Sequence, residues 1–149
     1  MGAMQEDFWN TKPLSELTDD EWEALCDGCG RCCVHSFIDE QTAERKYTNV
    51  ACRLLDGDSC RCRRYPQRTA LVGECLDLKH AGAQWLDRMP QTCAYRLRAR
   101  GQPLPSWHPL VSGRAESVHE AGISVRGKVI SEQHVHPRQR ESQVIDWIE

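Results

Sequence analysis

The chain is short of the large aliphatic and aromatic side chains that usually fill a protein core. Leu, Ile, Val and Phe together make up about a fifth of its 149 residues, and only two residues are Phe. So low a content is typical of disordered chains, which usually also carry a large net charge. The net charge here is only −3, and five Trp are present. We therefore expect a folded chain in which something besides aliphatic burial supplies part of the cohesion.

Long hydrophobic runs are also missing. No apolar stretch approaches the roughly 18 residues of a membrane-spanning helix, so no membrane association is expected. The N-terminal sequence MGAMQEDFWN lacks the basic and apolar regions of a secretion signal. We expect residues 1–7 to be a flexible N-terminus or an expression scar, followed by a single cysteine-rich metal-binding domain over residues 8–149. The expected location is the cytoplasm.

Cysteine, in contrast, is abundant. The nine cysteines are Cys26, Cys29, Cys32, Cys33, Cys52, Cys60, Cys62, Cys75 and Cys93. A disulfide framework is the competing interpretation, but the missing export signal and the odd number of cysteines argue against it. The adjacent Cys32 and Cys33 also cannot easily bridge to each other. Thiols in a cytosolic protein favour metal binding, and all nine are candidate ligands.

The run CDGCGRCC has the spacing of a site for a soft metal ion, because a short, bendable loop can bring several thiolates to one point. Gly28 and Gly30 lie between the thiols and let the backbone turn. Cys26, Cys29 and Cys32 share the C-x2-C-x2-C spacing with which bacterial ferredoxins hold three corners of a [4Fe–4S] cluster, although the C-P ending is absent. Tetrahedral zinc completed by distant cysteines is the alternative. Nine sulfurs allow two four-thiolate sites and one spare, or a binuclear site.

A bound metal would supply the cohesion that the aliphatic side chains do not. Structural zinc contributes about 10–16 kcal/mol of apparent binding energy in small domains. This is comparable with the whole net stability of an ordinary domain, about 5–15 kcal/mol. Arginines interleaved with the cysteines can offset the negative charge of thiolate sites, although an ordinary solvated face is the alternative. They are Arg31, Arg53, Arg61, Arg63 and Arg64.

The histidines carry weaker signals. His35, two residues past Cys33, is a possible ligand, but a surface or hydrogen-bonded role is favoured. His108 lies between a Trp and a Pro and is expected to be a packed structural residue. The pair His134 and His136 resembles a metal clip, but it lies in a polar tail.

The sequence predicts short elements joined by loops. We expect an arm over 8–17, a helix over 18–26, strands over 34–40 and 46–55 joined as a hairpin, a turn over 56–59, loop over 66–82, a helical turn over 83–89, a helix over 93–100, an extended segment over 103–109, a half-exposed strand over 123–129 and an apolar anchor over 144–148. The fold class that follows is a small, irregular α+β domain with short helices, a few short strands and long loops stapled by a cysteine-rich metal site.

Capping signals mark the two clearest helices. Thr18 and Glu21 form the T-x-x-E capping box of the first. Thr92 is a suitable N-cap for the second, and Gly101 is its expected C′ stop. This would place Cys93 in the first helical turn, where the helix dipole favours a thiolate.

Several motifs together resemble a known family. The chain carries, in this order, CDGCGRCC, TNVACRLL, CRCRRY, TCAYRL, SWHPLVSG, ISVR and VIDW. This series is similar to the bacterial CxxCxxCC family of zinc- or iron-chelating domains, and most of all to its YcgN-like branch. The resemblance implies that all nine cysteines occupy cysteine positions of that branch. A flagellin lysine methylase in the wider family joins such cysteines to an iron–sulfur cluster, but nothing in this chain matches a methyl-donor site.

The favoured function is therefore that of a cytosolic cysteine-rich protein that binds zinc or iron, and an iron–sulfur redox or enzyme-accessory protein is the alternative. No Cys/His/Asp arrangement, phosphate-binding glycine loop or dinucleotide fingerprint is visible, so no enzyme activity is expected. Basic clusters over 61–68 and 96–100 would suit a nucleic-acid-binding zinc module, but an isoelectric point near 6.1 argues against it. Metal ions are the expected partners.

Overall fold

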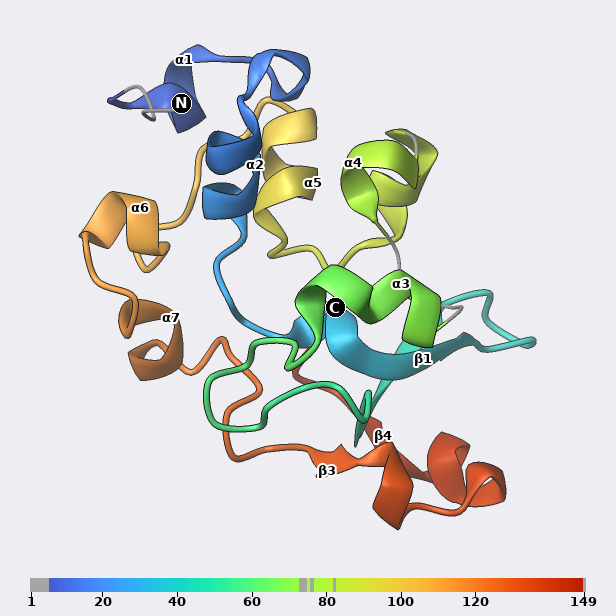
Figure 1. Cartoon of the computed structure of the whole chain (residues 1–149). Coiled ribbons are helices and arrows are strands. Elements are labelled where there is room, and N and C mark those ends of the chain that lie inside the picture. Colours follow the sequence, from blue (N-terminus) through green and yellow to red (C-terminus); the bar gives the residue numbers. More distant parts are fainter. Residues whose placement is uncertain (1–5, 73–74, 76, 82, 149) are drawn as a thin grey trace. The chain divides into compact units, whose positions relative to one another are not determined.

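The structure is a computed structural model that describes residues 6–72, 75, 77–81 and 83–148 (Figure 1). The chain forms two compact units, and each combines two separate stretches of sequence. The first unit is Met1–Asp27 with Leu76–Ile123, and the second is Gly28–Cys75 with Ser124–Glu149. Short helices and a few short strands confirm the predicted α+β class. Among the residues described, no helix is long and apolar enough to cross a membrane.

Two predictions about domain organisation stay predictions. The first is the single domain expected over 8–149. Most of the expected flexible N-terminus, residues 1–7, lies outside the described residues.

The first unit is built from short helices, where η denotes a 3-10 helix. They are α1 (Phe8–Thr11), η1 (Leu14–Glu16), α2 (Asp19–Leu25), α4 (Leu78–Ala81), η4 (Ala83–Arg88), α5 (Ala94–Ala99), α6 (Pro109–Ser112) and α7 (Ser117–Glu120). The predicted capping box begins α2: Thr18 Oγ1 accepts from the Glu21 N–H at 3.2 Å, and Glu21 Oε1 accepts from the Thr18 N–H at 2.9 Å. The buried Glu21 carboxylate also pairs with Lys12 Nζ at 2.8 Å, so its charge is compensated.

Helix α5 confirms the helix predicted over 93–100 but begins one residue later. The prediction of Thr92 as the N-cap is wrong. Cys93 is the N-cap, because it has an extended backbone and its carbonyl accepts from the Leu97 N–H at 2.9 Å. The Cys93 thiol therefore precedes the first turn. The expected stop at Gly101 is confirmed: its φ is +70°, and the Gln102 N–H donates to the Leu97 carbonyl at 2.8 Å, as in a Schellman motif.

A hydrophobic cluster holds the first unit together. Its buried members are Leu25, Ala94, Tyr95 and Leu104. Trp9 packs against this cluster and Phe8 is buried, so the arm expected over 8–17 docks by these two residues.

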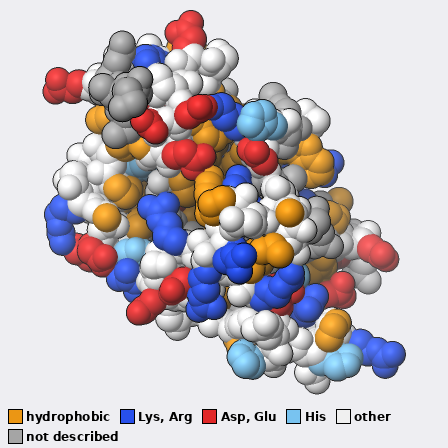
Figure 2. Space-filling view, viewed as in Figure 1, with side chains coloured by type: hydrophobic (Ala, Val, Ile, Leu, Met, Phe, Trp, Pro, Cys, Tyr) orange, Lys and Arg blue, Asp and Glu red, His pale blue; other side chains and the backbone are white. Residues whose placement is uncertain are grey.

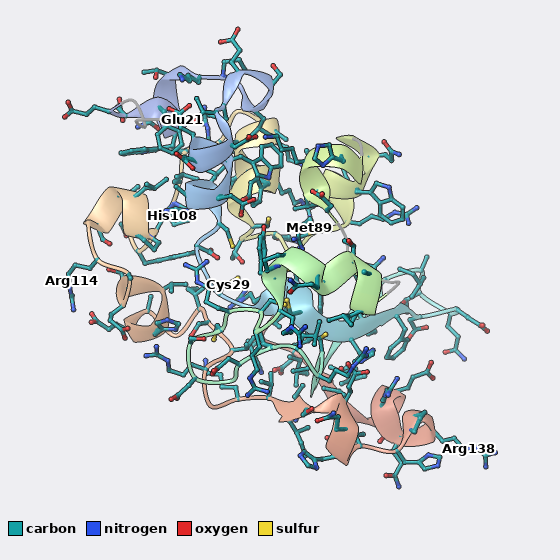
Figure 3. The ribbon with its side chains drawn as sticks, in the orientation of Figure 1. Glu21, Cys29, Met89, His108, Arg114 and Arg138 are labelled. Atoms are coloured by element: carbon teal, nitrogen blue, oxygen red, sulfur yellow. The ribbon has the colours of Figure 1, made fainter. Side chains whose placement is uncertain are left out.

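His108 is fully buried in the first unit, as expected for a packed structural histidine. Its Nε2–H donates to the Leu25 carbonyl at 2.7 Å, and its Nδ1 accepts from the Leu110 N–H at 3.0 Å. Burial lowers the pKa of His108, although the Leu25 carbonyl and the charge of Asp27 oppose the shift. The ring is therefore neutral and fastens α2 to the start of α6 (Figure 3). The expectation that Pro109 lies outside any helix is wrong, because proline is tolerated in the first helical turn, where α6 places it.

The second unit contains the strands. Its elements are η2 (Arg31–Cys33), β1 (Val34–Ile38), β2 (Arg45–Ala51), η3 (Tyr65–Gln67), α3 (Arg68–Leu71), β3 (Ile130–Ser131), η5 (Glu132–His134), η6 (Pro137–Gln143) and β4 (Val144–Ile145). Strands β1 and β2 form the predicted antiparallel hairpin, with Val34 opposite Ala51. β2 also pairs with β3 in parallel and with β4 in antiparallel orientation, so it is the central strand.

Three expectations for strands and loops of the chain need correction. The prediction of a strand over 123–129 is wrong, because the Lys128 N–H donates to the Val125 carbonyl at 2.9 Å across a turn and Gly127 has a φ of +70°. β2 ends at Ala51 rather than at residue 55. The loop predicted over 66–82 contains helical turns, since Pro66 suits the first turn of η3 and α3 follows directly. Residues 73, 74, 76 and 82 of that loop lie outside the described residues.

The core of the second unit lies around the central strand. Its buried members are Val34, Tyr47, Ala51, Leu55, Cys60, Val125 and Ile148. Ile148, with Trp147 packed beside it, confirms the predicted C-terminal anchor. On the face shown in Figure 2, hydrophobic side chains lie among charged side chains of both signs.

Gly30 should be one of the least replaceable residues of this core. Its φ is +75°, and a Cβ at this position would lie 2.8 Å from Val125 Cγ2. We expect Gly30→Ala to lower the free energy of unfolding by about 1–3 kcal/mol in a denaturant titration, through backbone strain and the clash. Gly57→Ala is the matched control, because no atom lies within 4 Å of its Cβ position. Equal stability of the two variants would contradict this packing.

The buried His108 should make stability fall at acidic pH. Its pKa is lower in the folded chain than in the unfolded chain, so the unfolded state takes up a proton below about pH 6.5 and gains stability. Urea unfolding of the wild type at pH 7.5 and 5.5 should show this loss. His108→Gln keeps a donor for Leu25 but cannot titrate, so its stability should change less between the two pH values. The exposed His134→Gln should lose as much stability between the two pH values as the wild type does. An equally large loss in His108→Gln would refute the assignment of this pH dependence to His108.

Candidate metal centre

All nine cysteines are among the described residues, and none of them forms a disulfide. Cys26 and Cys93 belong to the first unit, where both pack against the cluster around Leu25. The other seven cysteines belong to the second unit. The two units therefore hold the cysteines in unequal shares.

The β1–β2 hairpin brings two of the cysteine segments together. Just beyond the Val34–Ala51 pair, the Cys52 N–H donates to the Cys33 carbonyl at 2.8 Å. Cys32 Sγ lies 4.0 Å from Cys33 Sγ. The end of the sheet thus places the Cys32–Cys33 pair beside Cys52.

The predicted turn over 56–59 presents the next two cysteines. Asp56 Oδ1 accepts from the Asp58 N–H at 2.8 Å and from the Ser59 N–H at 3.2 Å. These hydrogen bonds lower the pKa of Asp56. Leu55 pairs with Cys62 across the turn. The turn therefore returns Cys62 to the end of β2, a few residues from Cys52.

Four thiols of the second unit lie near enough for their charges to influence one another. Burial raises the pKa of Cys75; the charge of Arg68 opposes this shift, and charges on Cys32, Cys52 and Cys62 add to it. Burial likewise raises the pKa of Cys52, and the Cys62 charge adds to the shift. We call Cys32, Cys52, Cys62 and Cys75 the four-thiol group. Its members come from four separate segments of the second unit.

Cys29 and Cys60 lie on either side of a different feature, the buried turn at Val125. The Cys29 carbonyl accepts from the Val125 N–H at 2.9 Å, and Cys29 Sγ accepts from the Arg31 N–H at 3.4 Å. Cys29 is labelled in Figure 3, on the segment between α2 and β1. Cys60 is buried with a φ of +60°, and burial raises its pKa against a hydrogen bond with Ser124.

The arginines predicted to accompany the cysteines have several roles. A Cβ on Gly28 would lie 3.0 Å from Arg61 Nη2, so the Arg61 guanidinium packs directly against the cysteine loop. Arg31 is buried, with its guanidinium carbon 5.6 Å from the ring centre of Trp147. Arg64 is exposed, in line with a solvated face. Among the predicted arginines, Arg61 lies against the cysteine loop and the Arg53 charge lowers the pKa of Cys52, whereas the Arg31 guanidinium lies over Trp147.

The histidines interact outside the cysteine set. His35 Nε2 lies 3.4 Å from Glu132 Oε1. His136 Nδ1 accepts from the Arg138 N–H at 3.1 Å and so caps η6, while His134 is exposed. Glu132 was missed by sequence reasoning, because it lies about 80 residues beyond Cys52 in a polar stretch without a motif.

The donor set fits a soft metal ion. Zinc and iron both accept thiolate ligands, and the second unit holds seven thiols with no disulfide among them. Within the described parts of the chain, no three Cys, His, Asp or Glu side chains already converge as metal ligands. The four-thiol group is therefore a set of neighbours whose side chains would have to draw together around an ion.

Comparison with known proteins places the chain in a family. Residues 25–94 match the CxxCxxCC family profile, described as "Putative zinc- or iron-chelating domain". A UPF0260 protein of Granulibacter bethesdensis is 53% identical over 94% of this chain and 83% of its own length. One of Cellvibrio japonicus is 51% identical over 97% of this chain and 98% of its own length. No solved structure matches the chain.

These matches agree with the resemblance predicted from the cysteine motifs. The identity extends over nearly the whole chain, well beyond the cysteine-rich segment. The chain belongs to the UPF0260 family, and its residues 25–94 match the CxxCxxCC domain profile.

Proposed function

We propose that this chain binds zinc or iron through cysteine thiolates, with Cys32, Cys52, Cys62 and Cys75 as one four-thiolate site. The observation that carries the proposal is the juxtaposition of four thiols by the β1–β2 hairpin, the turn after β2 and the segment after α3. The description of the matched family supports the same two metals. The other five cysteines remain proposed ligands, for a second site or for bridging positions. They are Cys26, Cys29, Cys33, Cys60 and Cys93.

Electrostatics explains why this arrangement suits a cation. Partial burial penalises the thiolate form of Cys52 and Cys75, and neighbouring thiolates repel one another, so the pKa of each is raised. A bound divalent ion would supply the positive charge that offsets both penalties, and the thiols would release their protons to the solvent. Arg68 contributes a further positive charge near Cys75.

The cellular setting follows from the same chemistry. Thiols persist in the reducing cytoplasm, so we propose a cytoplasmic protein whose partners are metal ions. An iron–sulfur protein with a redox or enzyme-accessory role is the second candidate, favoured by the C-x2-C-x2-C spacing of Cys26, Cys29 and Cys32.

Metal content of the native protein tests the proposal. Protein purified without oxygen should contain zinc or iron, measured by elemental analysis. A colourless zinc protein indicates thiolate zinc, whereas a brown protein with iron and sulfide indicates a cluster. Cys62→Ser should lose part of the metal and lower the melting temperature, because it removes one ligand of the four-thiol group. Ser59→Ala, a hydroxyl lost from the same turn, is the matched control. A metal-free wild type that stays compact would rule the function out.

A further inference from the structure

Glu132 lies directly beside one of the proposed ligands because of how β3 pairs. β3 runs parallel to β2 with Ser131 opposite Ala51, so the next residues along the two segments are Glu132 and Cys52. Glu132 Oε2 accepts from the Arg53 backbone N–H at 2.7 Å. The Glu132 side chain is only 15% exposed. A carboxylate is therefore fastened to the backbone immediately after Cys52.

The other oxygen of the same carboxylate faces a second cysteine segment. Glu132 Oε1 lies 3.4 Å from His35 Nε2 and 3.6 Å from Arg140 Nη2. His35 is two residues past Cys33, and its carbonyl accepts from Thr48 Oγ1 at 2.8 Å, which fixes its backbone to β2. Glu132 thus joins the segment after Cys33 to the segment after Cys52.

Arg53 extends this connection to a third cysteine segment. Its Nη2 donates to the Leu71 carbonyl at 2.7 Å, at the end of α3 and four residues before Cys75. The Arg53 backbone N–H therefore donates to Glu132, and the Arg53 side chain contacts the segment that leads to Cys75. Three cysteine-bearing segments meet in one polar network of Glu132, His35, Arg53 and Leu71.

The network keeps Glu132 ionised. Burial alone would raise its pKa, but the Arg53 N–H and the charges of His35 and Arg140 hold the pKa below its ordinary value. Glu132 Oε2 accepts from the Arg53 N–H, and Oε1 lies within ion-pair distance of His35 and Arg140, so the carboxylate is placed to fasten the segments rather than to reach an ion.

We propose that Glu132 is a positioning residue of the metal site, which holds the Cys33, Cys52 and Cys75 segments ready for coordination through His35 and Arg53. This inference rests on the proposed function. Residues that orient metal ligands from outside the coordination sphere typically change metal affinity by about 10–100-fold when they are replaced.

Anaerobic titration with Co²⁺ tests the proposal, because thiolate coordination gives intense charge-transfer absorption. Glu132→Ala should weaken Co²⁺ binding by about 10–100-fold. Its spectrum at saturation should equal that of the wild type, because no ligand is lost. Glu132→Gln keeps an oxygen acceptor for the Arg53 N–H and should restore most of the affinity. The exposed Glu141→Ala is the matched control and should bind like the wild type.

Two results would overturn the inference. Wild-type Co²⁺ affinity in Glu132→Ala would leave the metal site standing without a positioning role for Glu132. A changed spectrum at saturation would show that Glu132 is itself a ligand. A wild type that binds Co²⁺ without thiolate absorption would reject the proposed site as well, so the two failures can be distinguished.

A measurement on the metal-free, reduced protein gives an independent readout. Glu132→Ala and Glu132→Gln both lack the negative charge that raises the pKa of Cys52, but only Gln keeps an acceptor for the Arg53 N–H. Iodoacetamide labelling followed by mass spectrometry should therefore show faster modification of Cys52 in Glu132→Ala than in Glu132→Gln, with Cys29 unchanged in both. Equal labelling rates of Cys52 in the two variants would contradict the proposed network, and faster labelling of Cys29 would reveal a variant that has merely lost its fold.

Discussion

We infer that the second unit depends on holding neighbouring, partly buried thiols together around a cation. Burial raises the pKa of Cys52, Cys60 and Cys75, and the charges of neighbouring cysteines raise that of Cys75 further. Thiolates in this arrangement are unfavourable until a cation offsets their charge. Because the chain has few aliphatic side chains, we infer that metal–thiolate bonds supply much of the energy that orders its long loops.

The first unit is held together differently. Its core is small, but two buried polar side chains make their hydrogen bonds: Glu21 closes a capping box and pairs with Lys12, and His108 uses both ring nitrogens. A buried polar group stabilises a fold only when its hydrogen bonds are made, and these two also connect separate parts of the unit. Cys26 and Cys93 pack against the same cluster, so these two thiols are attached to a separately organised hydrophobic core.

Local signals in the sequence predicted the local structure. The capping box at Thr18, the glycine stop at Gly101 and the β1–β2 hairpin follow from short-range rules, and all three are confirmed. The prediction of a strand over 123–129 is wrong, because the alternating apolar residues belong to a turn. Val125 of that turn packs in the core of the second unit. Glu132 could not be found from sequence, because only the parallel register of β3 brings it to Cys52. The cysteine motif predicted the family and the candidate ligands, but the grouping of four thiols required the fold.

Hydrogen exchange of the metal-loaded and metal-free protein, resolved by segment, tests the central claim most directly. If metal–thiolate bonds hold the second unit together, removal of the metal with a chelator should sharply reduce amide protection at the end of β2, through Cys52 and the turn that follows. Helices α2 and α5 should change much less. Equal protection of the second unit with and without metal would contradict the account.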